Sequence, residues 1–289
     1  MDFTEHTATA AVVDSFADTP DPRLREILQR LVPHLHDFVR EVRPSTAEWE
    51  AAIRFLTATG QKCDDTRQEF ILLSDVLGVS MLVETINGQQ EGTESTVLGP
   101  FHVGESPRRE LGATIDLLGG TDPCVVTGRV LDPAGAPVAS ATVDVWQCTA
   151  DGFYDVQQPD LQPPGNGRGL FHTDADGQFW FRTVVPSHYP IPTDGPVGRL
   201  LDAGARHPFR PAHIHFIVEA AQHTSLTTHV FVGGSPYLDS DAVFAVKKSL
   251  VVPFDHVTDP DLAARYGLTG PFRLAHVDLV IEPEKSERG

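Results

Sequence analysis

The spacing of apolar residues changes near Glu84, and this change divides the chain into a helical region and a β-rich region. Before Glu84, apolar side chains recur at the three- and four-residue intervals of amphipathic helices. After it, short β-rich segments alternate with turn sequences such as DPAG and DADG. Many short strands separated by turns are typical of an antiparallel β-sandwich. We therefore predict a mainly β protein, with a helical domain over residues 1–95 and a β-sandwich domain over 96–289.

Three helices are expected in the first ninety residues. Asp21 is a plausible N-cap for a helix that carries one apolar stripe, and Pro33 predicts a kink or break within it. A capping-box pattern that begins at Ser45 predicts a second helix, ending near Gly60. A third helix is expected over residues 66–82.

Composition excludes several classes of protein. The chain has 289 residues, of which 40% are hydrophobic, and a formal net charge of -18. The hydrophobic content permits a packed core, whereas the negative charge argues against nucleic acid as a partner. No apolar run is long enough to span a membrane, and no basic, apolar leader begins the sequence. Three scattered cysteines predict neither a disulfide framework nor a zinc ribbon, so we expect a cytoplasmic protein.

The segment RPAHIHFIV, residues 210–218, has the alternation of a β-strand but carries two histidines. Residues two apart on a strand share a face and lie about 6.8 Å apart, so His213 and His215 can lean toward one metal ion. The same pattern also fits a strand whose solvent face carries two histidines. Apolar neighbours on both faces favour burial, and buried imidazoles need partners.

Two of the four tyrosines extend this candidate metal site. Tyr154 and Tyr189 border two long, Pro- and Gly-rich connections, 155–168 and 186–209. A tyrosine in such a place is also consistent with packing alone. Two phenolates are hard, anionic donors, which with two imidazoles favour a trivalent ion such as Fe(III) over zinc. Arg210 places a guanidinium at the start of the histidine strand.

At these residues the sequence resembles the intradiol ring-cleavage dioxygenases. The segments ESTVLGPF, DVWQCTADGFY, HYPIP and FRPAHIHF occur in the family's order, and the resemblance covers nearly the whole chain. It implies an enzyme in which Tyr154, Tyr189, His213 and His215 hold Fe(III). Arg210 would stabilise negative charge that develops on the substrate ring, and Tyr189 would be the ligand that leaves the metal and takes a proton.

The resemblance also implies a substrate and a set of pocket residues. Family members commonly carry glutamine in the place of His229, and the histidine resembles the branch that acts on hydroxyquinol (benzene-1,2,4-triol). Asp75, on an otherwise apolar helix, could meet the additional ring hydroxyl or be a solvated position. The full set of expected substrate-binding residues is Leu72, Asp75, Val97, Leu98, Gly99, Pro100, Phe101, Ile191, Pro192, Arg210, His229 and Val243.

The expected reaction is cleavage of hydroxyquinol by O2 between the two adjacent hydroxyl-bearing carbons, in the degradation of aromatic compounds. The product would be 3-hydroxy-cis,cis-muconate, the tautomer of maleylacetate. The resemblance further implies a homodimer formed through the N-terminal helices, in some members around a bound phospholipid.

Three other functions fit parts of the sequence. A catechol or chlorocatechol 1,2-dioxygenase would use the same site and give cis,cis-muconates. A zinc or manganese hydrolase would use the histidine pair but give the tyrosines no role. The segment CVVTGRVLDPAGAPVASATVDVW also resembles transthyretin-like sandwich modules, which bind ligands without catalysis. This module would explain the fold but neither the histidines nor the tyrosines.

Overall fold

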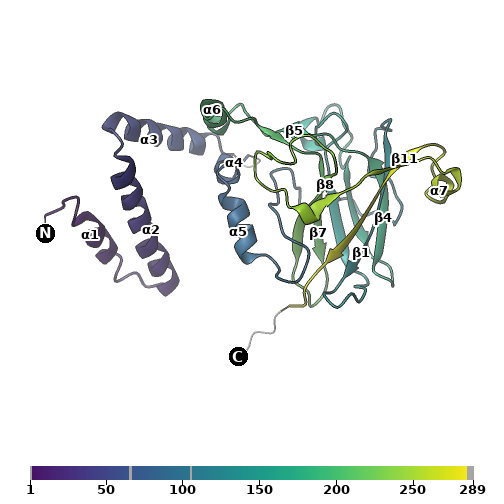
Figure 1. The fold of residues 1–289 in the computed structure, drawn as a ribbon, viewed down its shortest axis with the longest axis horizontal. Coiled ribbons are helices and arrows are strands. Elements are labelled where there is room, and N and C mark those ends of the chain that lie inside the picture. Colours follow the sequence, from purple (N-terminus) through teal and green to yellow (C-terminus); the bar gives the residue numbers. More distant parts are fainter. Residues whose placement is uncertain (1, 65–66, 105, 285–289) are drawn as a thin grey trace. The chain divides into compact units, whose positions relative to one another are not determined.

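A computed structural model of the chain describes residues 2–64, 67–104 and 106–284 (Figure 1). The chain divides into two compact units, Met1–Ala58 and Thr59–Gly289. The helices expected within residues 1–95 therefore fall in both units. The sandwich and the candidate site belong to the larger unit.

The smaller unit consists of helices, and their starts are set by the predicted caps. Its elements are α1 (Ala8–Asp14), α2 (Pro22–Val42) and the first part of α3 (Thr46–Gln61). The Asp21 carboxylate accepts hydrogen bonds from two backbone N–H groups of α2. At the start of α3, the Glu48 carboxylate accepts from the Ser45 backbone N–H and the Ser45 hydroxyl accepts from the Glu48 backbone N–H. α2 continues through Pro33, so the predicted break at this proline is absent.

The single helix expected over residues 66–82 is wrong, because the chain forms two helices there. These are α4 (Glu69–Val76) and α5 (Val79–Asn87). They are separated at Gly78, whose φ of 72° lies in the left-handed region that favours glycine. This turn ends α4 at Val76, directly after the buried Asp75, and so fixes where the Asp75 carboxylate lies.

Two stacked sheets form the core of the larger unit. One sheet has the order β10-β11-β1-β4 and the other β3-β2-β7-β8-β9. Their facing residues, among them Val126, Val145, Phe181, Ile214 and Phe216, form one buried apolar cluster. The strands are β1 (Pro123–Leu131), β2 (Thr142–Trp146), β3 (Arg168–His172), β4 (Gln178–Val184), β7 (His213–Glu219), β8 (Leu226–Val232), β9 (Val251–Val252), β10 (Asp255–Val257) and β11 (Phe272–Val280).

The expected sandwich is present, but its sheets are mixed rather than wholly antiparallel. β1 pairs in parallel with β11, and β8 pairs in parallel with β9, whereas the other pairs are antiparallel. Parallel neighbours require long connections, and the chain supplies them after β1 and β8. The remaining elements are the two-stranded sheet of β5 (Tyr189–Pro190) and β6 (Phe209–Arg210), the helices α6 (Pro196–Ala203) and α7 (Pro260–Arg265), and the 3-10 turns η1 (Asp155–Gln157) and η2 (Lys248–Leu250). Within the described residues, no helix combines the length and apolar character needed to traverse a bilayer.

Candidate metal centre

Strand β7 carries the two histidines on the face opposite the sandwich core. Ile214 and Phe216 point into the core, and the intervening alternation places His213 and His215 on the other face. Both histidines are almost completely buried. The Trp146 ring on β2, which pairs with His215 in register, stacks on the His215 imidazole with 4.5 Å between ring centroids.

Tyr154 reaches the centre from the loop that follows β2. Its backbone N–H donates to the Gln157 side chain at the start of η1. The next residue, Asp155, forms a buried ion pair with Arg168 on β3, with Nη2 2.6 Å from Oδ1. The Tyr154 ring also stacks on Phe101, with centroids 4.6 Å apart. These contacts on both sides fix the direction of the phenol.

Tyr189 reaches the centre from the two-stranded sheet. It is the register partner of Arg210, and Arg210 lies three residues before His213. One short β-ladder therefore places a phenol and a guanidinium beside the first histidine. The ladder is short: β5 ends at Pro190 and β6 ends before Pro211, and proline has no N–H to donate to a continuing ladder.

The four side chains converge on a common point. Tyr154 Oη lies 3.0 Å from His215 Nε2 and 3.3 Å from Tyr189 Oη. Tyr189 Oη in turn lies 3.3 Å from His213 Nε2. The structure thus brings together all four residues that the sequence singled out as ligands, from three separate segments of the chain.

The charges of these groups follow from burial. Burial lowers the pKa of His213 and His215 well below the usual range, so both imidazoles are neutral at pH 7. The His213 Nδ1 lies 2.7 Å from the Pro211 carbonyl, which can only accept, so the proton is on Nδ1 and Nε2 presents a lone pair. Burial raises the pKa of both tyrosines, so the phenols ionise only if a cation lies beside them.

The donor set fits a small, highly charged metal ion. Donors that each lie about 2.0–2.2 Å from one ion are separated by about 2.8–3.6 Å at tetrahedral or right angles. The observed separations of 3.0–3.3 Å fall in this range. Two phenol oxygens and two neutral imidazoles are also a chemically reasonable set for a trivalent ion, because ionised phenols would offset most of its charge.

Arg210 is a buried cation at the edge of this centre. Its Nη1 lies 3.3 Å from His213 Nε2, and its Nε lies 3.2 Å from Asp241 Oδ1. Burial is the largest single influence on the pKa of Arg210 and lowers it, but Asp241 together with the two tyrosines outweighs burial, so the pKa is raised. The sequence did not single out Asp241. Its segment, SPYLDSDAVFAVKKSL over residues 235–250, resembles the hydroxyquinol branch of the family, but nothing in the sequence marks this one acid as the partner of Arg210.

A cavity of about 780 Å³ lies beside the centre, lined by α4, the start of α5 and the segment 97–103. A narrow second cavity joins part of the same lining to Tyr189 and Arg210. Eleven of the twelve expected substrate-binding residues line one or both: Leu72, Asp75, Val97, Leu98, Gly99, Pro100, Phe101, Ile191, Pro192, Arg210 and Val243.

Asp75 is the acidic residue common to both cavities. Its carboxyl group is buried, and Oδ1 has no hydrogen-bond partner among the residues that the structure describes. Burial raises the pKa of Asp75, while Ser80 and Arg210 act in the opposite direction. α4 is held in place by Glu69, whose buried carboxylate accepts from Arg67 and from the backbone N–H of Val197.

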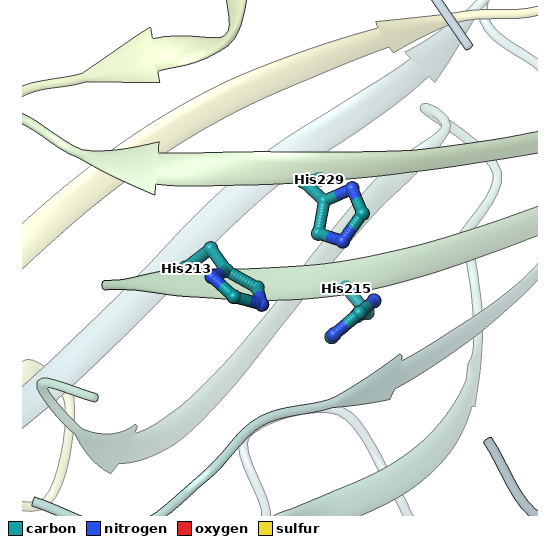
Figure 2. A group of neighbouring side chains, drawn as sticks. All are labelled: His213, His215 and His229. Carbon is teal, nitrogen blue, oxygen red and sulfur yellow. The ribbon is translucent and has the colours of Figure 1, made fainter. Parts of the chain in front are cut away.

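His229 does not line either cavity. It lies on β8 opposite His215, and Figure 2 shows it above the other two histidines with one ring nitrogen directed toward them. One ring nitrogen from each of the three histidines lies within 4.8 Å of the others. Because His229 lies outside both cavity linings, the expected contact between His229 and a substrate stays a prediction.

Comparison with known proteins gives a consistent result. The family model described as "Dioxygenase" matches residues 99–276, and the model "Catechol dioxygenase N terminus" matches residues 21–94. A hydroxyquinol 1,2-dioxygenase of Rhizobium sp. (strain MTP-10005) is 51% identical over 92% of this chain and 90% of its own length. A 6-chlorohydroxyquinol 1,2-dioxygenase of Cupriavidus pinatubonensis is 50% identical over 98% and 99%. The solved structure of a hydroxyquinol 1,2-dioxygenase from Pseudomonas putida DLL-E4 matches with a TM-score of 0.91 and 51% identity, over 97% of this chain and 99% of that one.

Proposed function

Since the chain belongs to the intradiol ring-cleavage dioxygenase family, we propose that it cleaves hydroxyquinol with O2 between the two adjacent hydroxyl-bearing carbons. The product is 3-hydroxy-cis,cis-muconate, which is the tautomer of maleylacetate. Both atoms of O2 enter the product, so no external reductant is required. The relatives named for hydroxyquinol and 6-chlorohydroxyquinol support this substrate class.

The observation that carries the choice of substrate is the unpartnered oxygen of Asp75. A diol ring bound in the larger cavity lies next to the narrow one, whose lining includes Tyr189 and Arg210. The remaining lining there includes the apolar residues Leu72, Val97 and Pro192. A third ring hydroxyl supplies the donor that the Asp75 carboxylate lacks, whereas catechol leaves this buried acceptor without a partner.

The residues that would hold Fe(III) are Tyr154, Tyr189, His213 and His215. Their spacing and the neutral state of both imidazoles support this assignment. When bound, Fe(III) supplies a Lewis acid that stabilises the ionised diol and draws electron density from it. Iron is favoured over zinc because two buried phenols ionise more readily beside a trivalent ion.

Tyr189 and Arg210 carry the roles that face the substrate. Tyr189 Oη, unlike the Tyr154 oxygen, belongs to a residue that lines the narrow cavity, so it can take a proton from an incoming hydroxyl. The Arg210 guanidinium is fixed by Asp241 and buried, so it stabilises negative charge on the ring without reorganising. Burial strengthens this interaction because little water screens it.

The test is oxygen uptake by iron-loaded protein with hydroxyquinol, 6-chlorohydroxyquinol, catechol and chlorocatechols in parallel. We expect the highest kcat/KM with hydroxyquinol, and a product with the absorbance and mass of maleylacetate. A higher kcat/KM for catechol would support the alternative, a catechol or chlorocatechol 1,2-dioxygenase. A colourless, zinc-containing protein without oxygen uptake would contradict the proposal.

A homodimer formed by the helical domain, residues 1–95, is the second part of the proposal. One face of α2 keeps its apolar side chains between 46% and 60% exposed, which is unusual for a helix without a partner. This face consists of Leu24, Ile27, Leu31, Leu35, Phe38 and Val42. A second copy of the chain would cover it, and a phospholipid acyl chain could fill part of the interface. Sedimentation at micromolar concentration and mass spectrometry of an organic extract test these two points separately.

The cytoplasm is the proposed location. Cys63, Cys124 and Cys148 all lie in described parts of the chain and are free thiols. Free thiols are typical of a reducing compartment. Fractionation of the source cells, with activity assayed in each fraction, tests this location.

A further inference from the structure

A third imidazole lies beside the proposed metal centre, and its position raises the question of what keeps it from binding the metal. His229 is 0% exposed, and its ring centroid lies 4.2 Å from that of His215 and 4.9 Å from that of His213. The Nε2 of His229 has no hydrogen-bond partner within the described ranges of the chain. Three imidazoles are the protein ligands of some divalent zinc sites. Here one ring nitrogen of each of the three histidines lies within 4.8 Å of the others, so a modest movement of the rings would bring them to one ion.

The three-histidine set and the two-tyrosine set favour different ions. Imidazoles alone suit zinc and other divalent ions, whereas phenol oxygens suit harder ions of higher charge. Both sets share His213 and His215, so binding by one excludes the full use of the other. A feature that withholds His229 would therefore favour the mixed tyrosine–histidine centre.

Thr96 contacts the other ring nitrogen of His229, Nδ1. The Thr96 hydroxyl lies within hydrogen-bond distance of His229 Nδ1, and both groups are buried. The backbone holds the threonine there, because its N–H donates to the carbonyl of Thr227 on β8 over 2.9 Å. His229 Nδ1 is the sole acceptor that the described residues offer to this hydroxyl, and a buried hydroxyl seldom leaves its proton unused.

This contact decides which ring nitrogen of His229 carries the proton. If the Thr96 hydroxyl donates to Nδ1, the proton of a neutral imidazole must be on Nε2. Nε2 then has no lone pair for a metal. His213 has the opposite arrangement, because its Nδ1 faces the Pro211 carbonyl, which can only accept. The two histidines are thus set in opposite tautomers by a hydroxyl and a carbonyl.

We propose that Thr96 is a positioning residue that fixes His229 in its Nε2-protonated tautomer and so withholds a third imidazole from the metal. The inference rests on the proposed metal centre at His213 and His215, but not on the identity of the substrate. It gives His229 a role in metal selection that is distinct from substrate contact. The segment that begins at Thr96 continues directly into the cavity lining at Val97.

The first test observes the tautomer directly. Two-bond ¹H–¹⁵N spectra of iron-free protein labelled with ¹⁵N-histidine report which nitrogen of each ring carries the proton, and His229→Gln identifies the signals of His229. We expect Nε2–H for His229 and Nδ1–H for His213. An Nδ1–H form of His229 in the unsubstituted protein would overturn the proposal, whatever the activity of the enzyme.

The second test measures zinc binding to iron-free protein by calorimetry. Thr96→Val removes the donor, and we expect zinc to bind about tenfold more tightly, in line with the size of outer-shell effects on metal affinity. Thr96→Ser restores the hydroxyl and should restore the original affinity. The gain should also be absent in the double variant Thr96→Val, His229→Gln, since the third imidazole is missing.

The matched control is Thr173→Val, which deletes another buried hydroxyl, one that donates to the Val138 carbonyl and has no contact with His229. It should leave the zinc affinity unchanged. Equal zinc affinity in Thr96→Val and the unsubstituted protein, with circular dichroism confirming the fold of both, would overturn the role of Thr96. Failure of the proposed function is seen separately, as a lack of Fe(III) colour and oxygen uptake in the unsubstituted protein.

Discussion

Two walls of the same cavity are held by different means. The wall with Tyr189 and Arg210 is part of a β-ladder, and its guanidinium is paired with a buried carboxylate. The wall with Asp75 is a two-turn helix between an ion pair and a glycine turn, and one of its buried oxygens has no partner within the described residues. In the first wall the buried guanidinium has a carboxylate partner. In the second wall, a buried carboxylate oxygen has no hydrogen-bond donor among the described residues.

This difference separates the groups expected to act in the reaction from the group expected to select the substrate. Groups that must keep a fixed geometry through the reaction are placed by register, which a single substitution does not shift. A group that recognises one ring substituent needs only to be buried and near the substrate. Substitutions in the β-ladder wall and the metal centre should therefore reduce turnover with every substrate, while substitutions in the α4 wall should change the order of preference.

The largest effect is expected from Tyr154→Phe in the metal centre. Loss of one phenol removes a proposed ligand oxygen and its charge, so the visible phenolate-to-iron absorbance should weaken and shift, because only the Tyr189 phenol oxygen remains. Activity with hydroxyquinol should fall by more than the roughly 10–100-fold that loss of an outer-shell partner costs. Tyr266→Phe, in a separate apolar cluster near α7, is the control and should keep the colour. An absorbance spectrum of Tyr154→Phe identical to that of the unsubstituted protein, at equal iron content, would show that Tyr154 is not a ligand.

Arg210→Ala should give the next largest effect. Without the guanidinium, developing negative charge on the ring is not stabilised, and kcat should fall by about 10²–10³-fold for hydroxyquinol and catechol alike. Iron content should remain close to that of the unsubstituted protein, because Arg210 is not among the proposed ligands. The Asp241 carboxylate is left buried and unpaired, so the free energy of unfolding should also fall, by about 3–5 kcal/mol.

Elemental analysis separates the two explanations for such a loss. Parallel losses of iron and turnover would assign Arg210 to metal retention rather than to charge stabilisation. Arg129→Ala is a matched control, because this arginine forms an exposed ion pair with Asp278. Its removal should change neither turnover nor iron content.

Asp75→Asn tests the other wall and should alter selectivity more than turnover. The hydrogen bond from a ring hydroxyl to a carboxylate contributes about 1.5–3 kcal/mol, so the preference for hydroxyquinol over catechol should fall by roughly 10–100-fold in kcat/KM. Glu84→Gln changes another acid in the cavity lining and serves as the control. An unchanged ratio of the two kcat/KM values in Asp75→Asn would remove Asp75 from substrate recognition.

The same carboxylate predicts a smaller effect of pH. Because burial raises the pKa of Asp75, it protonates at a higher pH than an exposed aspartate, and the neutral acid is a weaker acceptor. The preference for hydroxyquinol should therefore decline as pH falls through this raised pKa. For stability the sign is reversed. A raised pKa in the folded state means that protonation of Asp75 stabilises the fold at low pH, and this stabilisation is lost as the pH rises through the raised pKa. Asp75→Asn should then raise Tm near pH 8, with the gain vanishing below the usual pKa of 3.8.

Local sequence patterns were sufficient for much of this architecture. The alternation of β7 and the caps at Asp21 and Ser45 depend on neighbours in the chain, and the structure has them as expected. The separation of α4 from α5 at Gly78 was missed, because one glycine in an apolar run does not reveal its φ. Trp146 and Asp241 were missed for a different reason: their contacts with His215 and Arg210 arise from strand register and loop closure.

The smallest effect on turnover is expected for substitutions on α2. These substitutions test whether one copy of the chain is enough to form both walls of the cavity. Leu31→Glu with Leu35→Glu places charge on the exposed apolar face and should convert the proposed dimer to a monomer in sedimentation. The cavity residues all lie after residue 66, so kcat per iron should remain within about twofold, a change of less than 0.5 kcal/mol. Arg30→Glu, on the polar side of α2, is the control. A monomer with greatly reduced kcat would show that a second copy supports the α4 wall.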